Sequence, residues 1–145
     1  MSYWKWEKKY NTNIDVIDAQ HQRIVKYINT LHGCLENNET IKVSDVLHEM
    51  VDYTLTHFAF EEELMVQSGY PLELGHKQAH DEFSSKINEY QKRFDDGEDI
   101  SRELMEELKH WLASHIVYED AEYIPTVKNT FDPGWVRGAI NRFFN

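Results

Sequence analysis

The sequence predicts an all-α protein: an antiparallel up-down-up-down four-helix bundle with an N-terminal aromatic arm and a short C-terminal helix. Two observations lead to this prediction. Apolar residues recur at helical spacing in four blocks of the 145-residue chain, and the connections between the blocks are short. Short connections make consecutive helices antiparallel neighbours. A chain of this length can bury one hydrophobic core, so we expect a single domain over residues 1–145.

The first two helices are predicted over residues 18–35 and 43–65. An aromatic-rich arm, residues 1–17, precedes the first of them. The second ends at "SGYP", because glycine terminates helices and proline can begin the next one.

The last two helices of the bundle are predicted over residues 72–94 and 102–128. The loop "DDGEDIS" separates them, and Ser101 is suited to cap the start of the fourth helix. "FDPG" ends that helix. The remaining segment, residues 131–145, contains "WVRGAINRFF", which we expect to form a short amphipathic helix on the outside of the bundle.

Polar side chains occupy helix faces that point toward the predicted core. Burying imidazoles and a carboxylate without partners costs several kcal/mol each, so something must compensate. A single inward histidine is more often a hydrogen-bonded core residue than a ligand. Here, however, all four helices carry one, and this convergence favours a metal site. The residues are His21, His57, Glu61, His76, His80 and His115.

The donor types restrict the metal. Imidazole and carboxylate together suit Fe, Zn, Mn or Cu rather than Ca or Mg. Five histidines and a carboxylate exceed the tetrahedral set of one zinc ion. The number of donors suits two metal ions that share bridging carboxylates, and a bundle core is where such sites are built.

Composition and charge exclude several classes of protein. The formal net charge of −11 argues against a nucleic-acid partner and against docking to an anionic membrane. Cys34 is the only cysteine, so an intrachain disulfide is impossible and a reducing compartment fits. The N-terminus has no apolar signal region, and there is no apolar run of membrane length. We therefore expect a cytoplasmic protein with no membrane insertion.

Four motifs in order resemble those of the hemerythrin family, specifically its single-domain bacterial members, over about residues 10–131. They are "IDAQHQ", "HFAFEE", "GHKQAH" and "WLASHIVYEDAEY". The resemblance implies that the single domain is hemerythrin-like. It also implies a set of seven metal ligands: His21, His57, Glu61, His76, His80, His115 and Asp120.

The cofactor implied by this resemblance is a pair of iron ions with an oxo or hydroxo bridge. His76, His80 and His115 would hold one iron, and His21 and His57 the other. Glu61 and Asp120 would bridge both. The second iron would keep an open position for dioxygen. The resemblance therefore implies reversible oxygen binding for storage, delivery or sensing, and no enzymatic activity.

The same resemblance implies an oxygen pocket, although plain core packing is the alternative reading of its residues. The implied lining residues are Ile24, Phe58, Trp111, Leu112 and Ile116. Dioxygen is the expected partner, the protein is expected to be a monomer, and a protein partner for oxygen delivery is left open. Two other functions remain: a di-iron enzyme that detoxifies peroxide or nitric oxide, and a metal-binding interaction module.

Spacing and resemblance disagree at one ligand. On a regular helix Glu119 lies about 40° from the direction of His115, whereas Asp120 lies about 140° away. The resemblance nonetheless selects Asp120, and we follow it. The chain departs from the family pattern at Asn13, which stands where many members carry glycine before the first helix.

Overall fold

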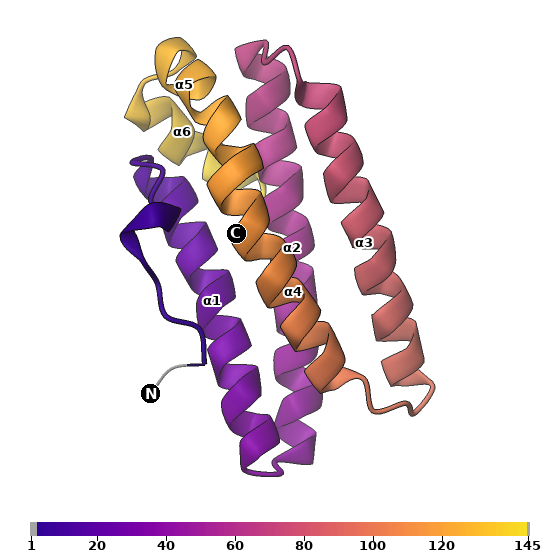
Figure 1. Ribbon diagram of the computed structural model, residues 1–145. Helices are drawn as coiled ribbons and strands as arrows, with labels where there is room; N and C mark the ends of the chain where they lie inside the picture. Colours follow the sequence, from indigo (N-terminus) through magenta and orange to yellow (C-terminus); the bar gives the residue numbers. More distant parts are fainter. Residues whose placement is uncertain (1–2, 145) are drawn as a thin grey trace.

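Four long helical segments form a bundle in the computed structural model, which describes residues 3–144. They begin with α1 (Asp15–Glu36), α2 (Thr40–Ser68), α3 (Glu73–Asp95) and α4 (Ser101–His115). In Figure 1 the α1–α2 and α3–α4 connections lie at the lower end and the α2–α3 connection at the upper end, so consecutive helices run in opposite directions. The described residues contain no strand. The predicted all-α four-helix bundle is confirmed.

The fourth segment is not one regular helix, as the prediction of 102–128 assumed. After α4 the chain makes a π-helical turn, η2 (Ile116–Asp120), and then continues as α5 (Ala121–Thr130). Pro125 lies inside α5 and has no N–H to donate to the carbonyl four residues earlier. The irregular turn and the proline thus occur in one stretch of the segment.

Helix α1 begins at Asp15, earlier than the predicted residue 18, so the arm is shorter than 1–17. The reason is the Asp18 carboxylate, which accepts hydrogen bonds from the backbone N of Thr12 at 2.8 Å and from that of Asn13 at 3.2 Å. These bonds hold the turn directly before the helix. Asn13 has φ 66°, a left-handed conformation that glycine and asparagine tolerate best. Asparagine therefore keeps the turn that glycine would allow.

Helices α2 and α3 also differ from their predicted bounds of 43–65 and 72–94 by a few residues at the ends. Helix α2 ends where Gly69 adopts φ 71° and the N–H of Tyr70 bonds the carbonyl of Met65 at 3.0 Å. The "SGYP" sequence thus stops the helix as expected. No helix among residues 3–144 combines the length and the apolar character that crossing a membrane requires.

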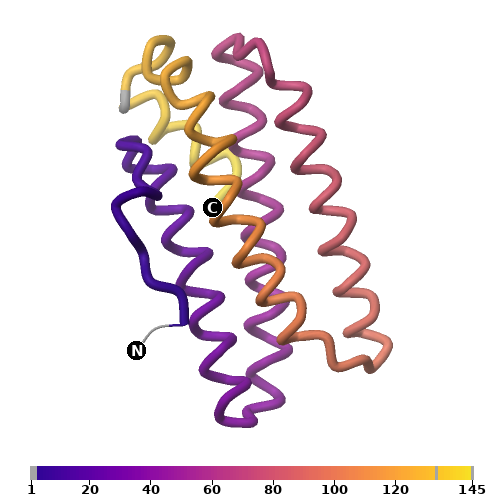
Figure 2. The backbone as a smooth tube through the Cα atoms, viewed as in Figure 1, coloured from indigo at the N-terminus to yellow at the C-terminus, as the bar shows by residue number. Residues whose placement is uncertain are grey.

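The aromatic arm runs along α1, as the indigo tube in Figure 2 shows. Trp4 is buried, and its backbone N–H donates to Oδ1 of Asn29 at 2.7 Å, while Asn29 Nδ2 donates to the Trp4 carbonyl at 2.8 Å. A short 3-10 turn, η1 (Lys8–Tyr10), follows. The arm is therefore part of the packed structure.

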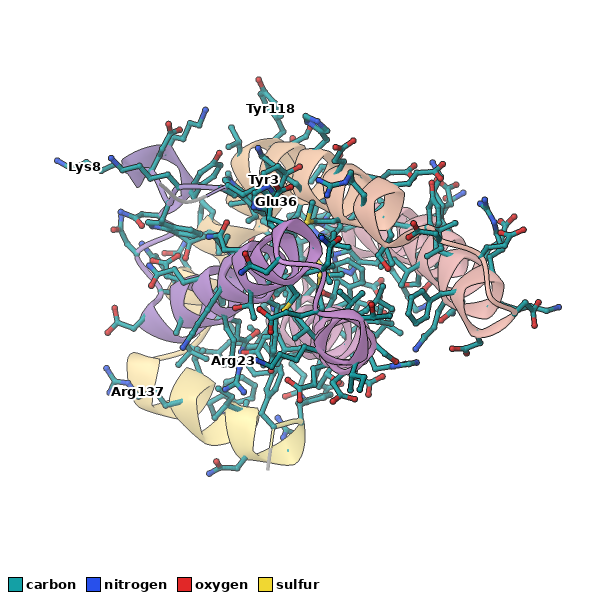
Figure 3. The ribbon with its side chains drawn as sticks, turned by 90° about the horizontal axis from the view of Figure 1, so that it is seen from below. Tyr3, Lys8, Arg23, Glu36, Tyr118 and Arg137 are labelled. Atoms are coloured by element: carbon teal, nitrogen blue, oxygen red, sulfur yellow. The ribbon has the colours of Figure 1, made fainter. Side chains whose placement is uncertain are left out.

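The C-terminal segment forms α6 (Pro133–Ala139) and a 3-10 turn, η3 (Ile140–Arg142). Asp132 caps α6 by accepting a bond from the Trp135 N–H at 2.8 Å. Figure 3 shows α6 outside the four helices, beside α1 and α2. Phe144 packs on Phe60 of α2 with 6.0 Å between ring centroids. The predicted short outer helix is present.

The hydrophobic core has two parts. One contains Phe58 with most of the interior of the bundle, and the other contains Phe60 and Leu64 together with residues of α5 and α6. His57 and Glu61 of α2 are fully buried and lie next to Phe58 and Phe60, where the two parts meet along this helix. The buried polar residues at this junction are called the polar band below.

Candidate metal centre

All seven predicted ligands are buried, none more than 7% exposed, and all four helical segments contribute. Their ligand atoms form two groups, each with all atoms within 4.8 Å of one another. The three-histidine group consists of Glu61, His76, His80, His115 and Asp120. The two-histidine group consists of His21, His57, Glu61 and Asp120. Glu61 and Asp120 belong to both.

In the three-histidine group, one carboxylate oxygen faces two imidazoles. Asp120 Oδ1 lies 2.9 Å from His76 Nε2 and 3.1 Å from His115 Nε2. His80 Nε2 lies 3.6 Å from Glu61 Oε1. Two ligands about 2.1 Å from one metal ion, at right angles, are about 3 Å apart. These separations are close to those of atoms that share a metal ion.

The two-histidine group is arranged similarly but offers fewer donors. His57 Nε2 lies 2.9 Å from Glu61 Oε1, and His21 Nε2 lies 3.3 Å from Asp120 Oδ2. Asp120 thus presents Oδ1 to one group and Oδ2 to the other. A carboxylate in this position is suited to bridge two ions.

Most of the atoms in these short contacts form no hydrogen bond. Both carboxylate oxygens of Asp120, Oε1 of Glu61, and Nε2 of His21, His57 and His76 have no hydrogen-bond partner. Leaving buried polar atoms unpaired costs about 1–3 kcal/mol each. Metal bound in both ligand groups would satisfy them. The residues therefore form a buried His/Glu/Asp cluster that is able to bind metal, and its donor types fit Fe, Zn, Mn or Cu.

Side chains outside the cluster hold two of the imidazole rings in place. His57 Nδ1 donates to Oε1 of Gln20 at 2.5 Å, and His80 Nδ1 donates to Oε2 of Glu62 at 3.1 Å. A proton on Nδ1 leaves the lone pair of Nε2 free for a metal. The sequence prediction did not name Gln20 or Glu62.

The fourth segment contributes two further outer contacts. His115 Nδ1 hydrogen-bonds Glu119, and the hydroxyl of Tyr123 donates to Oε2 of Glu61 at 2.5 Å. Glu119 therefore touches the side of His115 that faces away from the cluster, and its side chain is half exposed. Tyr123 is fully buried and fixes one oxygen of a shared carboxylate.

The π-helical turn explains why Asp120 enters the cluster and Glu119 does not. A π-helix has more residues per turn than an α-helix, so a residue five positions after His115 returns to nearly the same side. Asp120 is consequently buried beside His115 Nε2. The angular argument from a regular helix does not apply to this turn.

The two shared carboxyls keep their charge in spite of burial. Burial alone would raise the pKa of Asp120, but His115, His21 and His76 together lower it well below its ordinary value. Burial and the charge of Asp120 raise the pKa of Glu61, and His57 and His80 more than offset them, so that it falls. Metal ions bind the ionised form of such groups.

The two histidines with resolved pKa changes behave in opposite ways. Burial lowers the pKa of His115, but Asp120 and other carboxylates outweigh it and raise the pKa to about 9. For His57, burial is the larger influence and its pKa falls in spite of Glu61. The pKa of the Tyr123 hydroxyl rises well above 10 through burial and the charges of Glu61 and Asp120, so it stays a hydrogen-bond donor.

Four of the expected oxygen-pocket residues belong to the larger part of the apolar core, and Trp111 is partly buried against it. The Phe58 ring stacks on the His80 ring with 4.2 Å between centroids, and its centroid lies 6.2 Å from that of His57. Phe58 therefore adjoins both groups. Trp111 is only partly buried and stacks on His115 at 4.3 Å, which places it beside the three-histidine group. The remaining three are buried: Ile24, Leu112 and Ile116.

Comparison with known proteins agrees with this geometry. The family model described as the hemerythrin HHE cation binding domain matches residues 12–127. Bacteriohemerythrins of Pseudomonas paraeruginosa and Stenotrophomonas maltophilia are 41% and 43% identical to the chain over 152 aligned positions, covering 99% of each sequence. Myohemerythrin of Riftia pachyptila is 29% identical over 122 positions, which cover 84% of this chain and 92% of its own.

Solved structures lead to the same family. The crystal structure of wild-type hemerythrin superimposes with a TM-score of 0.82 at 27% identity, covering 87% of this chain and 98% of its own. A mutant of hemerythrin gives 0.83 over 88% of this chain. The chain belongs to the hemerythrin family.

Proposed function

We propose that this protein binds dioxygen reversibly at a di-iron centre and serves in oxygen storage, delivery or sensing. Seven residues would hold the two iron ions: His21, His57, Glu61, His76, His80, His115 and Asp120. The observation that carries the proposal is a pair of buried ligand groups that share Glu61 and Asp120. When bound, the iron pair supplies two electrons that can be shared with dioxygen and recovered.

The unequal number of donors supports binding of a small molecule at one position. The three-histidine group has five donor residues, and the two-histidine group has four. A metal ion with fewer protein ligands keeps room for an external one. The two-histidine group is therefore the proposed place of oxygen binding.

The surroundings support reversible binding over turnover. Ile24, Leu112 and Ile116 are buried apolar residues in the same part of the core as Phe58, whose ring stacks on His80. Apolar side chains exclude water and proton donors, which would otherwise release reduced oxygen and leave the iron oxidised. The hydroxyl of Tyr123, in contrast, is bonded to Glu61 and keeps its proton.

Spectroscopy tests this function directly. Iron-loaded protein prepared without oxygen should be nearly colourless, gain a visible charge-transfer band on exposure to oxygen, and lose it under argon over repeated cycles. Prompt irreversible oxidation with release of peroxide would contradict the proposal. Repeated consumption of peroxide in the presence of a reductant would instead support the enzymatic alternative.

Leu112→Asp provides a second test of the apolar environment. A carboxyl group at this buried position attracts water, so the variant should take up oxygen and then oxidise many times faster than the native protein. Leu112→Met is the matched control, because it keeps an apolar side chain of similar volume. Equal oxidation rates for the aspartate and methionine variants would show that Leu112 does not protect the site.

A further inference from the structure

The outward nitrogens of the ligand histidines have unequal partners in the two groups. In the three-histidine group, two imidazoles donate to carboxylates: His80 to Glu62 at 3.1 Å, and His115 to Glu119. Each of these rings is therefore backed by a full negative charge. The chain thus supplies two anionic partners on this side of the centre.

The two-histidine group lacks such partners among the described residues. His57 donates to the neutral amide oxygen of Gln20 at 2.5 Å, and Nδ1 of His21 has no hydrogen-bond partner. A carboxylate draws the proton of Nδ1 more strongly than an amide, and this makes Nε2 a better electron donor to a metal. The asymmetry in partners adds to the asymmetry in the number of histidines.

We propose that Glu62 and Glu119 act as positioning residues that strengthen His80 and His115 as metal ligands, so that the three-histidine group fills first and holds its metal more tightly. The two-histidine group fills second and exchanges its metal more readily. This inference rests on the proposed function, because it requires that both groups bind metal.

The two glutamates should contribute unequally. The Glu62 side chain is 19% exposed, whereas that of Glu119 is 50% exposed and therefore more strongly screened by water. Lys77 Nζ lies 3.7 Å from Oε1 of Glu62 and offsets part of its charge, but this lysine is itself 45% exposed. Glu62 should have the larger effect.

Stronger donors also stabilise the higher oxidation state of a bound metal. The iron in the three-histidine group should therefore be oxidised at a lower potential than the iron in the two-histidine group. Loss of a carboxylate partner should raise the potential of the former and leave that of the latter nearly unchanged. A residue with only a structural role would not produce this selective change.

Titration of the metal-free protein with Co²⁺ under anaerobic conditions tests the order of filling. We expect two Co²⁺ per chain in two resolved steps, followed through the visible absorption of each bound ion. Glu62→Gln should weaken the first step by about 10–100-fold, Glu119→Gln by less, and neither should change the second. Gln20→Glu should tighten the second step, because it gives His57 an anionic partner.

Glu106→Gln is the matched control, since this glutamate is exposed on α4, and its titration should equal that of the native protein. Far-UV circular dichroism of each metal-free variant establishes that it is folded. Reduction potentials of the iron-loaded proteins provide the second readout, with a rise at one iron only in Glu62→Gln.

Two outcomes would count against the inference in different ways. Two Co²⁺ that bind in indistinguishable steps, or equal weakening of both steps in Glu62→Gln, would overturn the inference while leaving the two-metal centre intact. Binding of no more than one Co²⁺ by the native protein would overturn the proposed di-iron function and the inference with it.

Discussion

The same four helices build two different interiors. Leu31, Leu47 and Leu104 come from α1, α2 and α4 and are buried together in an apolar cluster. In the polar band, the same helices bury histidines and carboxylates with unpaired atoms. Apolar packing stabilises the first interior by itself, whereas a bound metal would satisfy the unpaired atoms of the second. The stability of one part of the core is therefore independent of metal, and the stability of the other is coupled to function.

Removal of the metal should have the largest effect. At a thousandfold excess over its dissociation constant, each ion adds about 4 kcal/mol to the free energy of unfolding, so two ions add about 8 kcal/mol. For a domain of this size the melting temperature of the metal-free protein should fall by about 20 °C. Calorimetry of the two forms measures the difference. Equal melting temperatures would mean that the polar band is stable as a hydrogen-bonded network.

Asp120→Asn should abolish binding of both metal ions, because this carboxylate faces both groups and asparagine carries no charge. Glu119→Gln, one residue earlier, should retain both ions at saturating iron, with weaker binding. Metal analysis of the purified variants decides between them. Iron retained by Asp120→Asn and lost by Glu119→Gln would show that the ligands are assigned wrongly.

Leu47→Ala tests the apolar interior. The side chain is fully buried, and its truncation should lower the free energy of unfolding by about 2–5 kcal/mol in both the metal-free and the iron-loaded protein. The iron content should stay unchanged. Urea denaturation together with metal analysis checks both statements, and loss of iron in this variant would show that the two interiors are coupled.

A smaller effect concerns pH. Burial opposes protonation of His115, but Asp120 raises its pKa to about 9, above the ordinary 6.5. The contribution of protonated His115 to the free energy of unfolding is complete below pH 6.5 and is lost as the pH rises through 9. The metal-free protein should therefore lose roughly 2–3 kcal/mol between these values. Iron binding should strengthen over the same range, because ligands must be deprotonated.

Urea denaturation of the metal-free and iron-loaded proteins at several pH values between 6.5 and 9 measures both changes, because the difference between the two free energies of unfolding reports iron binding. Leu47→Ala is the control, since both pH dependences should persist in it at lower overall stability. If the free energy of unfolding changed equally with pH in the metal-free and iron-loaded proteins, the charge arrangement around Asp120 would be contradicted.

The fold and the inward faces of its helices can be predicted from the sequence because each depends on spacing within one helix. His76 and His80 lie four residues apart, as do His57 and Glu61, so each pair shares a face wherever the helix is regular. The helix ends were less predictable. The start of α1 depends on Asp18 bonding back to the preceding turn.

The rest of the site depends on contacts between elements. The π-helical turn that brings Asp120 beside His115 has no spacing signal of its own, and a regular helix favours Glu119. Gln20 and Glu62 each adjoin a ligand in the sequence, but neighbouring side chains on a helix point about 100° apart. Only the packing of α1 on α2 and of α2 on α3 shows which imidazoles they reach.

The iron content of the folded protein tests the central claim most directly. Protein produced with sufficient iron and purified without chelators should contain two iron ions per chain, because two ligand groups share Glu61 and Asp120. His57→Leu should reduce this number to one, since it removes a ligand from the two-histidine group alone. One iron ion or none in the native protein would contradict the account.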